Sequence, residues 1–309
     1  MNRILVIRGG AIGDFILTLP AINALRNANP HAQIEILGHK HIARLAEKRF
    51  YARRVRSIES AQLAGFFAKD AELPTEFSKY FAGFDLIVSY LHDPDGIFEA
   101  NLKRSGAHHI VCGPAKINNQ SHATRQLAAP VKRLGLAISD FAPKVYPSSG
   151  DRHRAEQFLS GLATPIVGFH PGSGSETKNW PIENWIELGS QLLKRCPASL
   201  VIVSGEADEV QTRRLESAWP SERVRFAKNL PLTDLAAALE RTIFVGHDSG
   251  ISHLAAAAGA RCILLFGATD PDVWAPLNEN ARIVCAPNGN LRCLDVDPVR
   301  DALEQRILI

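Results

Sequence analysis

Residues 242–259 read TIFVGHDSGISHLAAAAG, and they contain the strand, turn and helix that decide the fold. A short apolar run over residues 242–246 is followed by small or polar residues, and then by an apolar helical pattern that contains His253. An apolar strand that turns directly into a helix is typical of parallel α/β architecture. We therefore expect a parallel sheet, with this junction at the carboxyl end of one of its strands.

The same alternation of strand and helix patterns runs along the whole chain. Apolar strand patterns occur at residues 3–8, 33–37, 84–90, 108–113, 165–169, 199–204, 242–246, 262–266 and 282–286. A stretch rich in Pro and Ser, residues 142–158, interrupts the series near the middle. We expect two Rossmann-like doubly wound α/β domains, residues 1–148 and 149–309, facing a central cleft. Packing of the last helix back on the first domain is left open.

The composition is that of an ordinary globular protein, with 46% hydrophobic and 22% charged residues and a net charge of +3. This balance does not indicate a nucleic-acid partner. The densest basic stretch, residues 47–57, is most often a solvated helix face. The alternative is a patch that attracts an anionic substrate or a membrane surface.

Five scattered cysteines without a CxxC motif favour a reducing compartment. Cys262 lies in an apolar strand and is expected in the core. Cys285 and Cys293 have no histidine neighbours, and we expect neither a disulfide nor a metal site there. No signal-peptide pattern occurs, and no apolar run approaches the ~18 residues that span a bilayer. We therefore expect a cytoplasmic protein, with peripheral membrane contact left open.

A glycine-rich loop, RGGAIGDFI (residues 8–16), follows the first strand pattern. It departs from the dinucleotide motif, and Asp14 stands where a pyrophosphate would meet the helix, so a nicotinamide dehydrogenase is disfavoured. Asp14 has two open interpretations: a helix N-cap, or a general base for an acceptor hydroxyl. A helix N-terminus stabilises the ionised carboxylate and makes it a weaker base, which burial would have to offset.

The loop GFHPGSGSETKNWPIENW (residues 168–185) also follows a strand pattern. Its glycines, the hydroxyls of Ser173 and Ser175, and Lys178 form a candidate anion cradle, although the P-loop spacing is absent. An ordinary Ser/Gly loop with a surface lysine is the alternative. Trp180 and Trp185 are expected to pack in the core.

Two further strand ends carry polar side chains. In SGEADE (residues 204–209), Glu206 follows a strand and is a candidate ligand for both hydroxyls of a ribose. In the opening stretch, the first amides of the helix near Gly250 carry partial positive charge, and Ser249 and His253 can face the same anion. Asp248 is either the helix cap or part of this site. The combination favours a receptor for a diphosphate.

Five segments together resemble glycosyltransferase family 9, which contains the ADP-heptose:lipopolysaccharide heptosyltransferases. They are RGGAIGDFILTLPAINAL, HPGSGSETKNWP, SGEADE, HDSGISHLAAAAG and LFGATDPDVWAP. The resemblance covers nearly the whole chain in the correct order, and its most specific part is D-[ST]-G-x-x-H. It implies a GT-B fold, with the acceptor mostly on the first domain and the nucleotide sugar mostly on the second.

The resemblance also implies the chemistry and the site. Transfer would invert the anomeric carbon without an obligatory metal or other cofactor, from a donor expected to be ADP-heptose to an anionic lipopolysaccharide-core or related glycan acceptor at the inner membrane. Asp14 matches the catalytic base. The residues expected to bind substrate are Gly13, Ser173, Ser175, Lys178, Glu206, Asp248, Ser249, Gly250 and His253. Two alternatives remain: a GT-B-type nucleotide-sugar epimerase or hydrolase, and a non-catalytic nucleotide-sugar-binding homologue.

Overall fold

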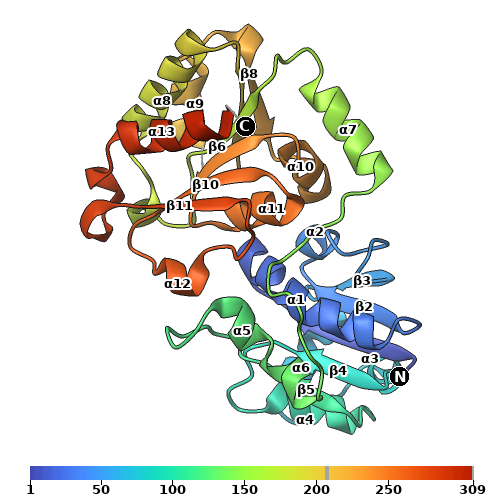
Figure 1. Cartoon of the computed structure of the whole chain (residues 1–309). Coiled ribbons are helices and arrows are strands. Elements are labelled where there is room, and N and C mark those ends of the chain that lie inside the picture. Colours follow the sequence, from blue (N-terminus) through green and yellow to red (C-terminus); the bar gives the residue numbers. More distant parts are fainter. Residues whose placement is uncertain (206–208, 308–309) are drawn as a thin grey trace. The chain divides into compact units, whose positions relative to one another are not determined.

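The computed structural model describes residues 1–205 and 209–307, and it divides into two compact units, Met1–Phe141 and Ala142–Ile309. Each unit contains its own parallel β-sheet with helices around it (Figure 1). The sequence pattern placed the division a few residues later, between residues 148 and 149. The separate roles of the two units remain predictions.

The first unit is built on a five-stranded parallel sheet with the order β3-β2-β1-β4-β5. Its elements are β1 (Arg3–Arg8), α1 (Ile12–Ala28), β2 (Gln33–Gly38), α2 (Lys40–Ala43), β3 (Arg54–Ser57), η1 (Ala61–Phe67), α3 (Thr75–Ala82), β4 (Leu86–Ser89), α4 (Ile97–Arg104), β5 (Ile110–Cys112), α5 (Ala123–Leu127) and α6 (Ala129–Arg133).

Helices cover both faces of this sheet, because alternate strand residues are buried on opposite sides. Leu5, Ile7 and Ile87 pack against an aromatic cluster from η1, α3 and α4, whose centre is Phe81. Helix α1 contacts α5 and α6 and is apolar almost all round, as expected of a helix buried between neighbours. It runs unbroken through Pro20.

The expectation of a helix over the basic stretch at residues 47–57 is wrong. Glu47 forms an isolated bridge with Ala52, and β3 then pairs in parallel with β2. The reason is local: β3 reads RVRS, and Val55 points into the core while its charged neighbours do not. Arg56 lies over the ring of Tyr80, 4.3 Å from the ring centre. Charged residues on an edge strand also hinder pairing with other chains.

The second unit is built on a six-stranded parallel sheet with the order β11-β10-β9-β6-β7-β8. Its elements are α7 (Ser149–Leu159), β6 (Ile166–His170), η2 (Glu176–Lys178), α8 (Ile182–Arg195), β7 (Ser199–Ser204), α9 (Glu209–Glu216), η4 (Ser221–Arg223), β8 (Val224–Lys228), α10 (Leu232–Leu239), β9 (Ile243–His247), α11 (Gly250–Ala258), β10 (Arg261–Phe266), α12 (Pro271–Trp274), β11 (Ala281–Cys285), η5 (Pro287–Gly289), η6 (Leu291–Cys293) and α13 (Val296–Ile307).

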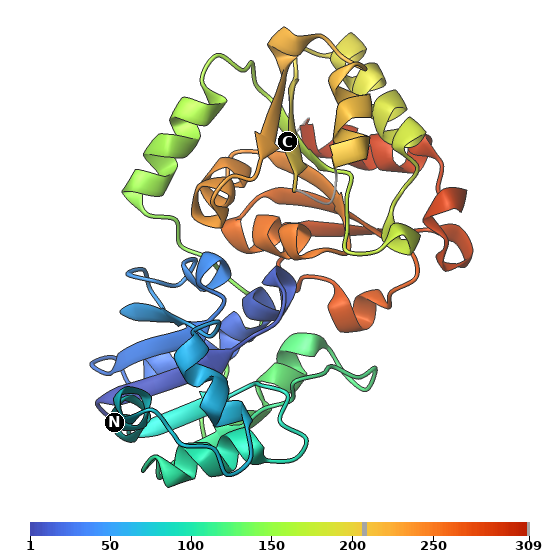
Figure 2. The same ribbon diagram turned by 180° about the vertical axis from the view of Figure 1, so that it is seen from behind.

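Helices again lie on both faces of the sheet, as Figure 2 shows for the same unit from behind. Val167 and Phe169 of β6 face a core shared with α8 and α13. Helices α10 and α11 contact each other, and α11 contacts β9 and β10. Helix α13 places its buried residues, among them Val299 and Leu303, in the core of this same unit. The predicted doubly wound α/β architecture is confirmed in both units.

Trp180, Trp185 and Cys262 are buried, as the sequence indicates. Trp180 and Trp185 are buried, with ring centres 5.3 Å apart in an edge-to-face arrangement, so their predicted packing role is confirmed. All five cysteines lie within the described residues and are free, and Cys262 is fully buried. Within residues 1–205 and 209–307, no helix has the length and apolar character needed to cross a membrane.

Candidate functional site

An ion pair joins two loops at the carboxyl edge of the second sheet. Strands β6 and β9 are parallel neighbours, so the loops that follow them meet at the same edge. Lys178 ends η2 in the first loop, and Asp248 follows β9 directly in the second. Their Nζ and Oδ2 atoms are 2.7 Å apart, with side-chain exposures of 31% and 9%. The anion cradle and the start of α11, predicted separately, are therefore one site.

The first turn of α11 is capped by Ser249. Its Oγ accepts the amide of Ser252 at 3.3 Å, which leaves Asp248 free of the capping role and available to Lys178. No acceptor among the residues that the structure describes faces the amides of Gly250 and Ile251. These two N–H groups lie at the positive end of the helix dipole. An anion placed there would meet two open donors.

His253 lies one turn into α11 and is 4% exposed. Its Nε2 atom is 3.9 Å from Asp248 Oδ1. Asp248 is thus placed between a lysine ammonium on one side and an imidazole on the other. The predicted residues Lys178, Asp248, Ser249, Gly250 and His253 are brought together within the second unit.

Two further histidines lie near the start of α11, and sequence reasoning assigned neither of them a role. His170 Nδ1 is 3.3 Å from Ser249 Oγ. His247 is fully buried, and its Nε2 accepts the amide of Trp180 at 2.8 Å. Burial, reinforced by the nearby His170 and opposed by the backbone of Gly172, lowers the pKa of His247 to about 3. A polar residue ending an otherwise apolar strand is the signal that could have found His247.

The serines of the predicted cradle bond within their own loop. Ser173 Oγ donates to the carbonyl of Ser175 at 2.7 Å and accepts its amide at 3.3 Å. Ser175 Oγ is 2.9 Å from Thr177 Oγ1. These bonds give the loop a fixed turn just before Lys178. An anion contact from either hydroxyl remains a prediction.

In the first unit, Asp14 is the third residue of α1, and Ala11 rather than Asp14 occupies the N-cap position. Its Oδ2 accepts the amide of Ala11 at 3.0 Å, and its Oδ1 is 3.1 Å from Arg8 Nη2. Gly10, with a φ of +90°, permits this arrangement, because a Cβ there would lie 2.7 Å from Asp14 Oδ2. The carboxylate is 36% exposed, so it is held in place and still accessible.

Arg8 is the partner that sequence reasoning missed, although it directly precedes the glycine loop. It is 4% exposed and also donates from Nε and Nη2 to the Asp14 carbonyl, at 3.3 Å each. Burial lowers the pKa of Arg8, while the nearby Asp14 and Tyr90 oppose that shift. Gly13 occupies the second position of α1, where helix amides have no partner within the helix.

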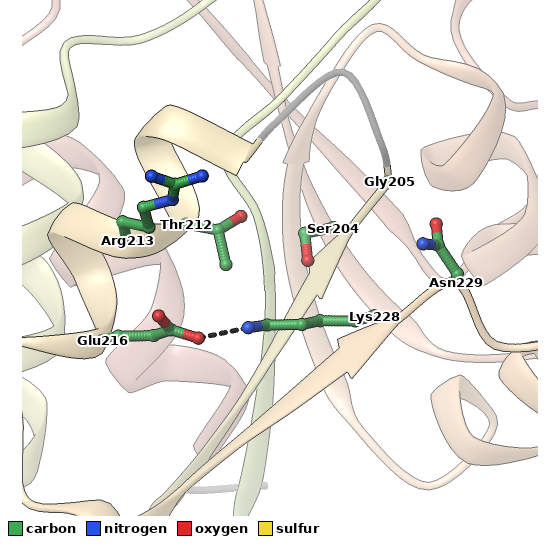
Figure 3. A pocket seen from close by; sticks show the side chains of 7 residues that line it. All are labelled: Ser204, Gly205, Thr212, Arg213, Glu216, Lys228 and Asn229. Atoms are coloured by element: carbon green, nitrogen blue, oxygen red, sulfur yellow. Dashed lines mark hydrogen bonds and ion pairs between the residues drawn. The ribbon is translucent and has the colours of Figure 1, made fainter.

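A cavity of about 260 Å³ lies at the carboxyl ends of β7 and β8, within the second unit (Figure 3). An ion pair between Lys228 and Glu216 links β8 to α9 at this cavity. Glu206, the candidate ribose ligand, is the next residue in the chain after Gly205, and it lies outside the described residues. The cavity is lined by Ser204, Gly205, Thr212, Arg213, Glu216, Lys228 and Asn229.

Comparisons with known proteins identify the family of this chain. The model of glycosyltransferase family 9 (heptosyltransferase) matches residues 105–301. Lipopolysaccharide heptosyltransferase 1 of Salmonella typhimurium strain LT2 is 26% identical over 318 residues, which cover 96% of this chain and 98% of the relative.

Two solved structures from Escherichia coli share the fold. The ADP-heptose lipopolysaccharide heptosyltransferase II superposes with a TM-score of 0.80 at 18% identity and covers 100% of this chain and 99% of its own. A heptosyltransferase solved with ADP has a TM-score of 0.72 at 21% identity, with 98% and 99% covered.

The fold is thus that of the GT-B glycosyltransferases, and the protein is an enzyme of the glycosyl-transfer class. The chain belongs to glycosyltransferase family 9, the heptosyltransferase family.

Proposed function

We propose that this enzyme transfers a heptose from ADP-heptose to a lipopolysaccharide-core or related anionic glycan acceptor, with inversion and without a metal ion. The observation that carries the proposal is the Lys178–Asp248 pair beside the open amides of Gly250 and Ile251. This arrangement offers an ammonium and a helix N-terminus to one anion.

The leaving group of such a transfer is a nucleoside diphosphate, whose negative charge grows as the glycosidic bond breaks. In this proposal, Lys178 and the first amides of α11 stabilise that charge, which the ion pair of Lys178 with Asp248 at the start of α11 supports. Removing one donor from a preorganised site typically costs roughly 3 kcal/mol of barrier, or about a hundredfold in rate. The protein would thereby supply the positive potential itself.

Asp14 is the proposed base for the acceptor hydroxyl. In an inverting transfer the hydroxyl loses its proton to a carboxylate while its oxygen attacks the anomeric carbon from the side opposite the diphosphate. Arg8 and the Ala11 amide each hold one oxygen of Asp14, which fixes the orientation of the carboxylate. Gly13, one residue earlier on α1, would contact the substrate through its backbone.

The nucleoside is proposed to bind near the cavity at the ends of β7 and β8, with Glu206 on the ribose hydroxyls. Gly205, the residue that precedes Glu206 in the chain, lines this cavity. One E. coli heptosyltransferase has been solved with ADP and also with ADP-2-deoxy-2-fluoro heptose. Those complexes support adenine as the base and heptose as the sugar for this chain.

The acceptor is proposed to be attracted to the basic segment, defined here as residues 40–54, which runs from the start of α2 to the first residue of β3. It contains six Lys or Arg residues and one Glu, so its net charge is +5, whereas the whole chain carries +3. Lys40, Arg44, Lys48, Arg53 and Arg54 are all exposed. A lipopolysaccharide precursor is anionic and membrane-borne, so this segment would place the enzyme at the cytoplasmic face of the inner membrane.

Isothermal titration calorimetry in the presence of EDTA tests the donor site. We expect ADP to bind wild-type protein, and Lys178→Ala to weaken binding at least tenfold. Lys194→Ala, which removes an exposed lysine from α8, is the matched control and should bind ADP normally. Loss of all ADP binding on EDTA treatment would contradict the metal-free site.

A product assay then tests the reaction class. We expect ADP release from ADP-heptose to depend on added acceptor. Free heptose, or an altered heptose, formed from the donor alone would support the hydrolase or epimerase alternative instead.

A further inference from the structure

We propose that His247 is a positioning residue for the donor diphosphate: its imidazole accepts the main-chain amide of Trp180 and thereby holds Lys178 against Asp248. This inference rests on the proposed function, because it assigns Lys178 to the diphosphate. His247 lies outside the predicted set of site residues. It is fully buried, so it acts on the ligand only through its neighbours.

Two cross-links tie the same pair of segments together. His247 Nε2 accepts Trp180 N–H at 2.8 Å, and Lys178 Nζ lies 2.7 Å from Asp248 Oδ2. The linked residues are 67 and 70 positions apart in the chain, yet each bond joins residues 178–180 to residues 247–248. The hydrogen bond and the ion pair are therefore neighbours, and the first limits where the second can form.

The hydrogen bond defines the protonation state of the ring. Because Nε2 accepts a hydrogen bond, the proton of a neutral imidazole must reside on Nδ1. A protonated ring would present an N–H group to the Trp180 amide and break the bond. Burial lowers the pKa of His247 to about 3, which keeps the ring in the accepting form near neutral pH.

Trp180 is fixed at its other end as well. Its indole Nε1 donates to the carbonyl of Leu294 at 2.7 Å, and the ring packs against Trp185 in the core. On the other side of Lys178 lies the glycine-containing loop, in which the hydroxyls of Ser173 and Ser175 bond to residues of the same loop. Trp180 is thus the residue of this segment that is anchored to the core. Two residues of chain span at most roughly 7 Å, so anchoring Trp180 confines the backbone of Lys178.

Two substitutions separate the hydrogen bond from the bulk of the ring. His247→Gln keeps an acceptor oxygen at a reach similar to Nε2, whereas His247→Leu removes every acceptor. We expect His247→Leu to weaken ADP binding at least tenfold and His247→Gln to restore it to within about threefold of wild type. Amide hydrogen exchange of Trp180 should accelerate in the Leu variant and stay protected in the Gln variant.

A stability control and a double-mutant cycle exclude a general packing effect. Leu303→Ala removes a buried side chain of α13 in the same core, so it should lower the melting temperature without changing ADP affinity. In a Lys178→Met background, His247→Leu should cause little further loss of ADP binding, because its effect passes through Lys178. Equal losses with and without Lys178, or equal losses in the Leu303 control, would overturn the positioning role.

The two proposals fail in different ways. Wild-type protein that does not bind ADP would refute the proposed donor. The hydrogen-exchange rate of the Trp180 amide would still test whether His247 holds that amide. Conversely, normal ADP binding by His247→Leu would reject the positioning role and leave the proposed donor site intact. Unchanged exchange at Trp180 in the Leu variant would show that the imidazole does not hold this amide.

Discussion

The guanidinium of Arg8 lies 3.1 Å from Asp14 Oδ1 and also donates twice to the Asp14 main-chain carbonyl. One arginine therefore fixes both the side chain and the backbone of the proposed base. The arginine ends β1 and the aspartate lies in the first turn of α1, so the pair spans the glycine turn between them.

Loss of the Arg8–Asp14 ion pair is expected to slow turnover without changing the affinity for the donor. Arg8→Met should lower kcat by roughly 10- to 100-fold, since a base displaced by about 1 Å can lose that much. Arg8→Lys should recover part of the loss, and ADP affinity should stay at the wild-type value in both. Steady-state kinetics measure the loss in kcat, and calorimetry measures whether ADP affinity is unchanged. In an Asp14→Asn background, which should itself lose at least a hundredfold, Arg8→Met should add nothing if it acts through Asp14.

Ser249 permits a test of helix capping against anion binding. Ser249→Ala removes the acceptor of the Ser252 amide and should lower the free energy of unfolding by about 1 kcal/mol. Ser249→Asp keeps a capping oxygen but adds a negative charge where the diphosphate is proposed to bind. We expect the Asp variant to retain most of the stability and to lose at least tenfold in ADP affinity. Normal ADP binding by Ser249→Asp would contradict the proposal that the diphosphate binds at this turn.

The pH dependence of stability should carry a signature of His247. An unfolded histidine titrates near pH 6.5, whereas burial lowers the pKa of His247 in the folded protein to about 3. Between these values only the unfolded chain binds the proton, so the free energy of unfolding falls as the pH drops, by at most about 1.4 kcal/mol per unit. His247→Gln should reduce this slope in urea titrations between about pH 7 and pH 5. Identical slopes for the two proteins would contradict the lowered pKa.

The basic segment predicts binding to anionic membranes. Each exposed Lys or Arg near such a surface contributes about 1 kcal/mol, so Arg53→Ala with Arg54→Ala should weaken binding to phosphatidylglycerol vesicles roughly 30-fold. ADP affinity should not change. Lys69→Ala with Lys79→Ala, which removes two exposed lysines of the same unit, is the control for net charge. Equal losses in both double variants would show that residues 40–54 are not a specific contact surface.

The sequence pattern predicted most of the fold, because buried parallel strands read as continuous apolar runs. Of the strands in the described part of the chain, nine were located to within a few residues. The two that were missed, β3 (RVRS) and β8 (VRFAK), each lie at one edge of their sheet and carry charged residues. Arginines flank or separate the apolar residues of both strands, so a search for continuous apolar runs does not reveal them.

The sequence predicted which loops form the candidate site, but it did not predict which side chains bond to each other there. Strand ends indicated Lys178 and Asp248, since parallel strands deliver their carboxyl ends to one edge. Which side chains would bond could not be read from residues some 70 positions apart, and the capping role went to Ser249 instead of Asp248. Arg8 and His247 were missed because each acts on a neighbour in space, and their own local sequence carries only a faint sign of it.

The carboxylate of Asp248 also matters when no ligand is bound. Without it, the empty enzyme would leave an ammonium beside the positive end of a helix, two like charges with nothing to balance them. The internal counter-ion offsets that repulsion, so Lys178 can keep its position without a bound anion.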